Sequence, residues 1–369
     1  MPIHAPTSLA ALQEFVREHE AVRVCGAGTK SALSAGATVS TRELHGLVDY
    51  DPQELTITVL AGTRVADVDA WLAAHGQYLP CEPPFDAAGA TVGGSVAAGL
   101  SGSARYRYGG LRDFLIAVRF VDATGAVVRG GARVVKNAAG FDLPKLMVGS
   151  QGVFGVLTEA SFKVFPRPPA RATLLVGYAS DREALAAFSR LSLCALDVEC
   201  LDWLPGQHVA MRVAGRAEAL PRRLERIAEI AEGRIERLDV DEDESYWRAV
   251  RSLVGLETAE ALLKLALRPS EIAEVERDLV STGAAPYRRY VAGGHQAWIG
   301  WDEGRACARG DAHAMARWAS RMTVLRGRCP WARQAAIDDH GFGARIKRAL
   351  DPTGKFLAGP ARGDASDGG

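Results

Sequence analysis

Four glycine-rich segments in the first 156 residues have a composition suited to a large anionic ligand. Residues 25–30 bring Gly26, Gly28, Thr29 and Lys30 together, so one short segment offers open backbone, a hydroxyl group and a cation. Consecutive backbone N–H groups in such a turn converge on an anion, provided that no side chain blocks the approach. Taken alone, the segment is also typical of a plain turn after a strand. The four segments together predict one long, flat cofactor that carries a diphosphate.

The other glycine segments are expected to enclose the remainder of the same ligand. The backbone of residues 91–94 is expected to lie against a planar ring or a polyol chain, and Gly99 permits a further tight turn. Residues 149–156 are expected to enclose the other end, where Val156 offers main-chain polar groups to a purine. Asp113 either accepts hydrogen bonds from a polyol or caps a loop.

Two widespread nucleotide-binding motifs are absent. A dinucleotide-binding fingerprint needs glycine or alanine three residues after its second glycine, and the first segment has Ser31 there. A P-loop needs serine or threonine after its Gly-Lys pair, but Lys355 is followed by Phe356. Neither a nicotinamide-binding fold nor a P-loop nucleotidase is therefore predicted.

The composition is that of an ordinary soluble protein. The chain has 369 residues, 48% of them hydrophobic and 24% charged, which suits about two or three domains. The formal net charge is zero, which argues against a nucleic acid or an anionic membrane surface as partner. The six cysteines lack the C-x-x-C spacing of zinc and iron–sulfur sites and favour a reducing, cytoplasmic setting. The N-terminus lacks the blocks of a signal peptide, and no apolar run reaches the roughly 20 residues that span a bilayer.

A proline cluster at residues 166–169 predicts the first domain boundary. We expect a cofactor-binding domain, a second domain, a C-terminal segment that returns to the first domain, and a disordered tail, over residues 1–168, 169–340, 341–360 and 361–369. In the second domain, helical and strand patterns alternate, which predicts an α+β fold with helices on one side of a mostly antiparallel sheet.

Residue spacing predicts the individual elements. Helices are expected after an N-cap at Ser8 and over residues 66–75, 181–191, 217–231, 241–253, 269–280, 311–325 and 342–350. Strands are expected over residues 21–24, 56–60, 115–121, 126–128, 154–165, 197–203, 208–213, 261–267 and 296–301.

The glycine segments resemble the FAD-binding domain of the vanillyl-alcohol oxidase/PCMH flavoprotein family. Residues 25–30 look like the pyrophosphate loop of that family, and residues 91–97 look like its isoalloxazine-side segment. Residues 79–84, 135–143 and 146–159 resemble more closely the FAD-binding E subunits of bacterial glycolate oxidases. The resemblance implies a PCMH-type FAD-binding domain of two α+β subdomains and a mixed α+β cap domain with an antiparallel sheet.

The resemblance is strong over residues 20–168 and resumes at residues 346–352. With the glycine segments, it predicts FAD as the cofactor. The predicted cofactor contacts are Gly26, Ala27, Gly28, Thr29, Lys30, Pro83, Thr91, Val92, Gly93, Gly94, Ala97, Gly99, Tyr108, Gly109, Asp113, Gly149, Ser150, Gly152, Gly155 and Val156.

The resemblance also implies a function within a complex. It implies the oxidation of glycolate to glyoxylate, with a larger flavoprotein subunit and an iron–sulfur subunit as partners. The complex would be cytoplasmic and reach the inner membrane only indirectly. The chain departs from the family pattern where Phe356 is followed by Leu357, and no histidine for covalent flavin attachment is evident. Cys25 is a substitute for that histidine or, more simply, a spectator thiol.

The sequence offers few residues for the oxidation itself, which needs a base for the hydroxyl proton and a cation for the carboxylate. Related 2-hydroxy acid dehydrogenases carry a G-H-x-G-D-G-N-x-H segment, and this chain has none. His340 is the candidate base, although a solvated loop histidine fits its surroundings equally well. Arg212 and Arg268 are candidate carboxylate clamps or ordinary charged residues at strand ends. No metal site is predicted.

Two functional readings follow. In the first, the chain is a flavin-bearing subunit that depends on its partners for catalysis. In the second, it is a free-standing FAD-dependent 2-hydroxy acid dehydrogenase whose site lies between the domains. A scaffold without flavin is disfavoured, because ordering four glycine-rich segments costs conformational entropy that a bound ligand offsets.

Overall fold

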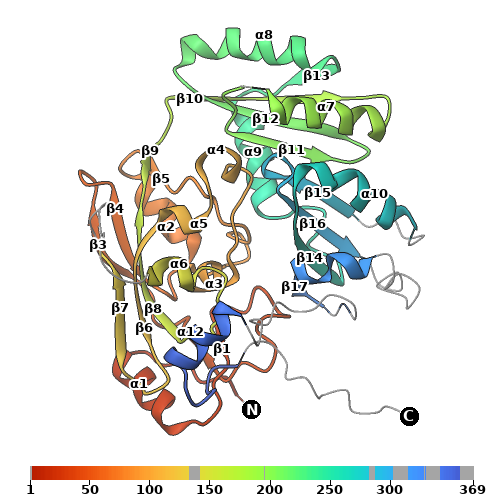
Figure 1. Cartoon of the computed structure of the whole chain (residues 1–369). Helices are drawn as coiled ribbons and strands as arrows, with labels where there is room; N and C mark the ends of the chain where they lie inside the picture. Colours follow the sequence, from red (N-terminus) through yellow and green to blue (C-terminus); the bar gives the residue numbers. More distant parts are fainter. Residues whose placement is uncertain are drawn as a thin grey trace.

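The structure is a computed structural model that describes residues 2–132, 142–194, 196–281, 287–301, 315–327, 329 and 341–357. The N-terminal half of the chain builds a five-stranded sheet, and the second half builds an eight-stranded sheet (Figure 1). The helix of the C-terminal segment returns to the N-terminal half (Figure 1). No helix among these residues has the length and apolar character needed to cross a bilayer.

The N-terminal half begins as the spacing predicts. Ser8 accepts a hydrogen bond from the Ala11 N–H and caps helix α1 (Leu9–Glu18), whose buried face includes Leu12 and Val16. The chain then enters the short parallel strands β1 (Val24–Cys25) and β2 (Val39–Ser40).

The five-stranded sheet is antiparallel throughout, in the order β3-β4-β8-β6-β7. Its strands are β3 (Leu47–Asp51), β4 (Thr56–Leu60), β6 (Leu115–Val121), β7 (Val127–Gly131) and β8 (Val156–Lys163). The small antiparallel pair is β5 (Gln77–Tyr78) and β9 (Phe165–Pro166). The helices of this half are α2 (Val65–Ala73), α3 (Val92–Ala98), α4 (Arg105–Tyr108), α5 (Leu111–Phe114) and α6 (Leu143–Met147).

The eight-stranded sheet begins at Ala170, directly after the proline cluster, and every neighbouring pair is antiparallel. In sheet order its strands are β13 (Arg234–Arg237), β10 (Ala170–Gly177), β12 (His208–Gly215), β11 (Cys200–Leu204), β15 (Tyr287–Val291), β16 (Gln296–Trp301), β14 (Ala261–Ala266) and β17 (Met322–Arg326). The α-helices are α7 (Asp181–Leu193), α8 (Leu220–Ala231), α9 (Val240–Arg251) and α10 (Ile272–Ser281). The 3-10 turns are η1 (Ala217–Ala219), η2 (Pro269–Glu271), η3 (Ala292–Gly294) and η4 (Ala316–Arg321).

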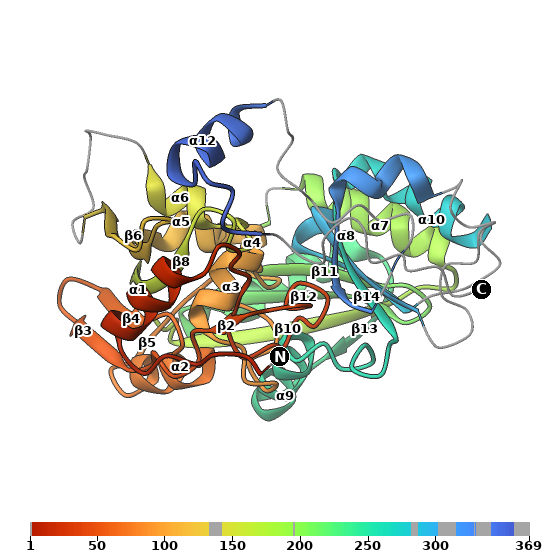
Figure 2. The same ribbon diagram turned by 90° about the horizontal axis from the view of Figure 1, so that it is seen from below.

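The two faces of this sheet bury different partners, because side chains alternate along each strand. On β12, Val209, Met211 and Val213 join the core that contains α7, α8 and α10. The intervening Ala210 packs with Trp247 of α9 and with Ala104 of the N-terminal half. One face is therefore covered by the sheet's own helices, and the other lies against α9 and the N-terminal half (Figures 1 and 2). The predicted α+β class with an antiparallel second sheet is confirmed.

The predicted helix over residues 311–325 is wrong for residues 322–325, which belong to strand β17. Met315, Trp318, Met322 and Leu325 recur at helical spacing and are all buried. Met315 and the 3-10 helix η4 are helical, but from Met322 on, pairing with β14 satisfies the backbone and overrides the local pattern. Strands β2, β3, β5, β10, β13 and β15 were also not predicted.

The C-terminal segment is fastened to the N-terminal half by a buried charged group. The Asp351 carboxylate accepts hydrogen bonds from the backbone N–H groups of Lys355 (2.8 Å) and Phe356 (2.7 Å). It also pairs with Lys347 of helix α12 (Phe342–Leu350), whose Nζ reaches the carbonyl oxygen of Val153 at 2.6 Å. The Phe356 side chain is 1% exposed, so the departure that follows it in sequence does not prevent this contact.

We predict that Asp351→Asn lowers the free energy of unfolding by about 1–3 kcal/mol at neutral pH, since charge-assisted hydrogen bonds to buried donors are lost. Burial raises the pKa of Asp351, but its hydrogen bonds from Lys347, Phe356 and Lys355 outweigh burial and hold the pKa below its usual value. A carboxyl whose pKa is depressed on folding stabilises the protein above its unfolded pKa and loses that effect as the pH falls. The difference between wild type and variant should therefore shrink below about pH 4, in urea unfolding at several pH values.

The matched control is Glu43→Gln, which removes the exposed ion pair between Arg42 and Glu43. Such surface pairs contribute less than about 1 kcal/mol, so this variant should unfold like the wild type. Equal effects of the two substitutions would contradict the role given to Asp351.

Candidate cofactor-binding site

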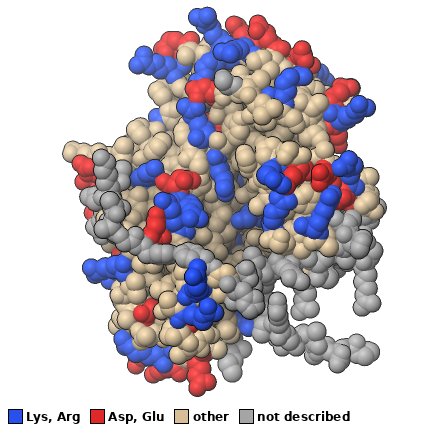
Figure 3. Space-filling model, viewed as in Figure 1, with Lys and Arg blue, Asp and Glu red and all other residues tan. Residues whose placement is uncertain are grey.

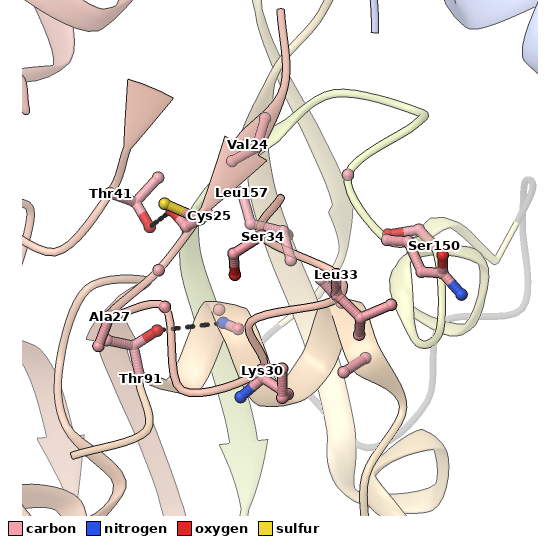
Figure 4. A pocket seen from close by; sticks show the side chains of 18 of the residues that line it. Val24, Cys25, Ala27, Lys30, Leu33, Ser34, Thr41, Thr91, Ser150 and Leu157 are labelled. Atoms are coloured by element: carbon pink, nitrogen blue, oxygen red, sulfur yellow. Dashed lines mark hydrogen bonds between the residues drawn. The ribbon is translucent and has the colours of Figure 1, made fainter. Parts of the chain in front are cut away.

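Three of the glycine segments meet around one cavity in the N-terminal half. The cavity lies between the loop after β1, helix α3 and the segment before β8, and it spans about 630 Å³, part of which is open to solvent. In Figure 4, Ala27 and Lys30 lie on the loop side, and Ser150 faces them from across the opening. Its lining includes the predicted residues Gly26, Ala27, Gly28, Lys30, Thr91, Gly93, Gly94, Ala97, Ser150, Gly152 and Gly155.

Helix α3 forms one wall of the cavity, where the sequence suggested a loop at residues 91–94. Thr91 is the N-cap, and its Oγ1 accepts a hydrogen bond from the Gly94 N–H at 3.2 Å. A side chain at residue 93 would place its Cβ 2.8 Å from the Cβ of Ala61, so only glycine lets α3 pack this closely on the end of β4. In the same way, a Cβ at Gly26 would lie 2.1 Å from the Thr91 hydroxyl oxygen. These two glycines bring the first loop and α3 together.

The segment before β8 forms the third wall of the cavity and is hydrogen-bonded to the carboxyl end of α3. The Gly149 N–H donates to the carbonyl oxygen of Val96 at 2.9 Å, and the Gln151 N–H donates to that of Ala97 at 2.8 Å. These bonds satisfy carbonyl groups that a helix leaves unpaired at its end. The position of the segment before β8 is thereby tied to that of α3.

Lys30 supplies the cavity with a buried cation. Its side chain is 6% exposed, and its Nζ lies 2.9 Å from Thr29 Oγ1 and 5.5 Å from the ring centroid of Phe85. None of the described carboxylates pairs with it, and burial lowers the pKa of Lys30 to about 8. A buried cation without a counter-ion is suited to bind an anionic group.

Polar groups on the opposite wall lack partners. Ser150 Oγ and Gln151 Oε1 are buried and make no hydrogen bond to any described residue. Gln151 also has a φ of +51°, which side-chain-bearing residues rarely adopt. Unpaired buried polar atoms and local strain cluster at ligand sites. Together with Lys30 and the exposed glycine backbone, they fit a cofactor that carries phosphates and a polar ring.

Cys25 lies at the cavity, but its environment does not activate it. Burial raises the pKa of the thiol, although a hydrogen bond to Ser40 and the charge of Arg42 partly oppose that effect. A protonated thiol is a poor nucleophile, so the spectator reading fits better than covalent attachment of flavin.

Several predicted contact residues have structural roles outside this cavity. Asp113 accepts a hydrogen bond from the Gly110 N–H at 2.8 Å and so caps α5. Tyr108 packs edge-on against Tyr78 and Phe165. The other predicted residues that do not line the cavity are Thr29, Pro83, Val92, Gly99, Gly109, Gly149 and Val156.

Two of the catalytic candidates, Arg212 and Arg268, do not line the cavity. Arg212 is 3% exposed and binds two carboxylates, those of Glu82 and Glu199, so its guanidinium is already paired. Arg268 has a side chain that is 78% exposed and pairs with Glu271, the last residue of η2. His340 lies outside the described residues, as do Lys136 and Asn137 of the segment at 135–143.

Sequence reasoning missed part of the lining. Ser34 and Thr41 follow the first loop, and Leu33 and Leu157 supply apolar surface. Gln151 stands between two predicted glycine positions, and its place in that motif was a usable signal. Leu33 and Leu157 gave no usable signal, because nothing in the sequence distinguishes them from leucines of the core. Lys264 of β14, in the second domain, does not line the cavity but was also missed: its Nζ lies 3.2 Å from the carbonyl oxygen of Gly99 at the end of α3.

We predict that Lys30→Met weakens FAD binding by at least about tenfold, because the cavity loses its cation. Burial lowers the pKa of Lys30 to about 8, and an anion bound beside this amine favours its protonated form. Wild-type affinity should therefore stay constant below about pH 8 and fall as the pH rises above it. The affinity of Lys30→Met should be independent of pH in this range, measured by flavin fluorescence titration, with Lys30→Arg as the charge-conserving control. An unchanged wild-type affinity between pH 7 and about pH 10 would contradict the role of this amine.

We also predict that Gly93→Ala weakens FAD binding by at least about tenfold and lowers stability by about 1–3 kcal/mol, because the added methyl group forces α3 away from Ala61. Gly177→Ala at the end of β10 is the control, since its Cβ would meet nothing closer than 3.8 Å. Calorimetric titration and thermal unfolding test both effects. If Gly93→Ala binds FAD normally, the close packing of α3 does not set the cavity.

Comparisons with known proteins agree with this geometry. Residues 3–131 match the model of a family described as FAD binding domain. The chain is 43% identical over 169 residues to the glycolate oxidase subunit GlcE of Escherichia coli (strain K12), in an alignment that covers 45% of this chain and 48% of that protein. It is 30% identical over 181 residues to the glycolate oxidase subunit GlcD of Bacillus subtilis (strain 168), covering 49% of this chain and 38% of that one. The matches thus span about half the length of these relatives, or less.

Solved structures share the architecture. A structure of alkyldihydroxyacetonephosphate synthase superposes with a TM-score of 0.66 and 12% identity, over 95% of this chain and 76% of that one. At this identity the likeness shows the fold alone. With the family match and the cavity, it identifies a PCMH-type FAD-binding fold. The N-terminal half of this chain is an FAD-binding domain, and its cofactor is FAD.

Proposed function

We propose that the chain is the FAD-binding subunit of a glycolate oxidase complex, which oxidises glycolate to glyoxylate with a larger flavoprotein subunit and an iron–sulfur subunit. The observation that carries this proposal is the lining of the cavity. It offers a cation, glycine backbone and unpaired polar atoms to a cofactor, but its described residues include no histidine and no carboxylate. The chain is thus equipped to hold FAD and poorly equipped to remove a proton from a substrate.

In the proposed site, Lys30 and the backbone of residues 26–28 hold the diphosphate, and α3 and the segment at 150–152 flank the ring system. When bound here, FAD would supply an acceptor for the electrons released by oxidation of a 2-hydroxy acid in the complex. Lys30 remains protonated near neutral pH, since its pKa of about 8 lies above that range.

The two arginines considered as carboxylate clamps are already paired with carboxylates of this chain. Arg212 is neutralised by two carboxylates and Arg268 by Glu271, so neither is free to bind a substrate carboxylate. Among the described residues, no group of three or more His, Cys, Asp or Glu side chains is arranged to hold a metal ion. We therefore assign the proton-removing base and the electron-transfer clusters to the partner subunits. The similarity to GlcE and GlcD, which are glycolate oxidase subunits, supports this assignment.

The alternative is a free-standing FAD-dependent 2-hydroxy acid dehydrogenase, which Lys264 favours. This lysine reaches the end of α3 beside Ala98, which lines the cavity, and burial lowers its pKa to about 8. It has no carboxylate partner among the described residues and is placed to bind a small carboxylate. The D-lactate dehydrogenase (cytochrome) 1 of Saccharomyces cerevisiae mitochondria, 32% identical over 161 residues, adds support from its name.

We further propose that the complex works in the cytoplasm and meets the inner membrane only through partner subunits. Acidic and basic side chains are intermixed over the face shown in Figure 3, and the net charge is zero. Such a surface is not suited to strong attraction by an anionic bilayer.

The experiment is anaerobic addition of glycolate to the FAD-loaded chain, alone and after assembly with the two partner subunits. The proposal predicts that flavin absorbance in the isolated chain persists with glycolate, and that the complex is reduced rapidly. Bleaching of the isolated chain would favour the free-standing dehydrogenase. D-lactate serves as a second substrate in both arms, because it differs from glycolate by one methyl group.

A further inference from the structure

The segment between β5 and α3 is strained at two side-chain-bearing residues. Glu82 has a φ of +40° and Phe85 a φ of +68°, both in the left-handed region that favours glycine. Such a backbone persists only where the surroundings hold it in place. The contacts that hold these residues are therefore informative.

The second domain holds this segment at two points. Arg212 of β12 donates from Nη2 to both carboxylate oxygens of Glu82, each at 3.0 Å. The carbonyl oxygen of Arg251, at the end of α9, accepts a hydrogen bond from the Phe85 N–H at 3.1 Å. The Nε atom of Arg251 lies 3.8 Å from Asp86 Oδ2. Strands β10, β11 and β12 pass beside the N-terminal half, so these contacts cross the junction of the two domains (Figure 2).

The pair formed by Glu82 and Arg212 belongs to a balanced buried network. Arg212 Nε lies 2.7 Å from Glu199 Oε2, and Arg171 Nη2 lies 3.0 Å from Glu199 Oε1. The Arg212 guanidinium also stacks over Trp247, 4.7 Å from the ring centroid. Burial raises the pKa of Glu82, but the charges of Arg212, Arg251 and Arg171 together outweigh burial and hold that pKa below its usual value. Two carboxylates and two guanidinium groups thus neutralise each other, and removing one member leaves a buried charge unpaired.

The held segment reaches the cofactor cavity through Phe85. Its ring is 3% exposed and lies 5.5 Å from Lys30 Nζ. The only hydrogen-bond partner that the described residues offer this amine is the flexible hydroxyl of Thr29. The position of Lys30 therefore depends on the ring beside it, and the position of that ring depends on contacts from the second domain.

We propose that Glu82 and Arg212 are positioning residues for cofactor binding: docking of the second domain holds the strained segment at 82–86, and Phe85 thereby seats Lys30 for the diphosphate of FAD. The inference rests on FAD as the ligand of the cavity. It assigns to the second domain a share of the cofactor affinity, although none of the described lining residues belongs to it.

The test is a double-mutant cycle between Glu82→Gln and Lys30→Met in the full-length chain, read as FAD affinity by fluorescence titration. Glu82→Gln should weaken FAD binding by about tenfold and flatten the pH dependence above about pH 8. In the Lys30→Met background, Glu82→Gln should have little further effect, because the group that it positions is gone. Independent, multiplying effects of the two substitutions would overturn the proposal, since a general loss of packing does not depend on Lys30.

Phe85→Leu tests the connection without touching the ion pair, and it decides the matter if Glu82→Gln does not fold. It should weaken FAD binding in the same Lys30-dependent way. The control is Ser103→Ala, which removes another buried hydrogen bond across the same junction, 2.5 Å long and made to Asp202, without touching the segment at 82–86. Ser103→Ala should lower the unfolding temperature and leave FAD affinity within about twofold of wild type.

Wild-type affinity in both Glu82→Gln and Phe85→Leu would overturn the inference while the cofactor assignment stands. A wild-type chain that binds no FAD would overturn the cofactor assignment and the inference together. A loss of FAD affinity in Ser103→Ala as large as that in Glu82→Gln would also overturn it, because any weakening of the junction would then suffice.

Discussion

The close packing of helix α3 against Ala61, which residue 93 permits because it has no side chain, is the contact on which the rest of the site depends. From this position the amino end of α3 meets the first glycine loop at Gly26. Its carboxyl end binds the backbone of Gly149 and Gln151. Three segments that are far apart in sequence thereby become the walls of one cavity. A site built in this way needs few specific side chains, which explains why its sequence signature is mostly glycine.

The second domain contributes through one face of its sheet. Alternate residues of β11 and β12 place apolar side chains under helices α7 and α8 and place Asp202 and Arg212 at the junction with the N-terminal half. Buried ion pairs of this kind add little net stability, because desolvation opposes the attraction between the charges. They do fix orientation, since each donor must meet its acceptor. The junction is therefore better suited to setting the relative position of the two halves than to strengthening the fold.

The sequence was sufficient to predict the α+β class, the antiparallel second sheet and much of the cavity lining, because clustered glycines and strand alternation are local signals. It was not sufficient for Asp113, whose cap of α5 and whose proposed polyol contact require the same residue type. Arginine is a residue type that suits a carboxylate clamp. Only the fold reveals that the Arg212 guanidinium is already bound to Glu82, 130 residues away in sequence. Strand β17 carries helical spacing in its apolar residues, and long-range pairing with β14 decides its conformation. The predictions thus fail where the sequence permits more than one role or conformation and tertiary contacts decide between them.

The proposed function depends on the cavity beside α3 being an FAD site within this chain. The most direct measurement is a calorimetric titration of FAD into the cofactor-free, full-length chain, with no partner subunit present. The account predicts saturation at one FAD per chain. An absence of binding, with the chain shown to be folded by circular dichroism, would contradict it.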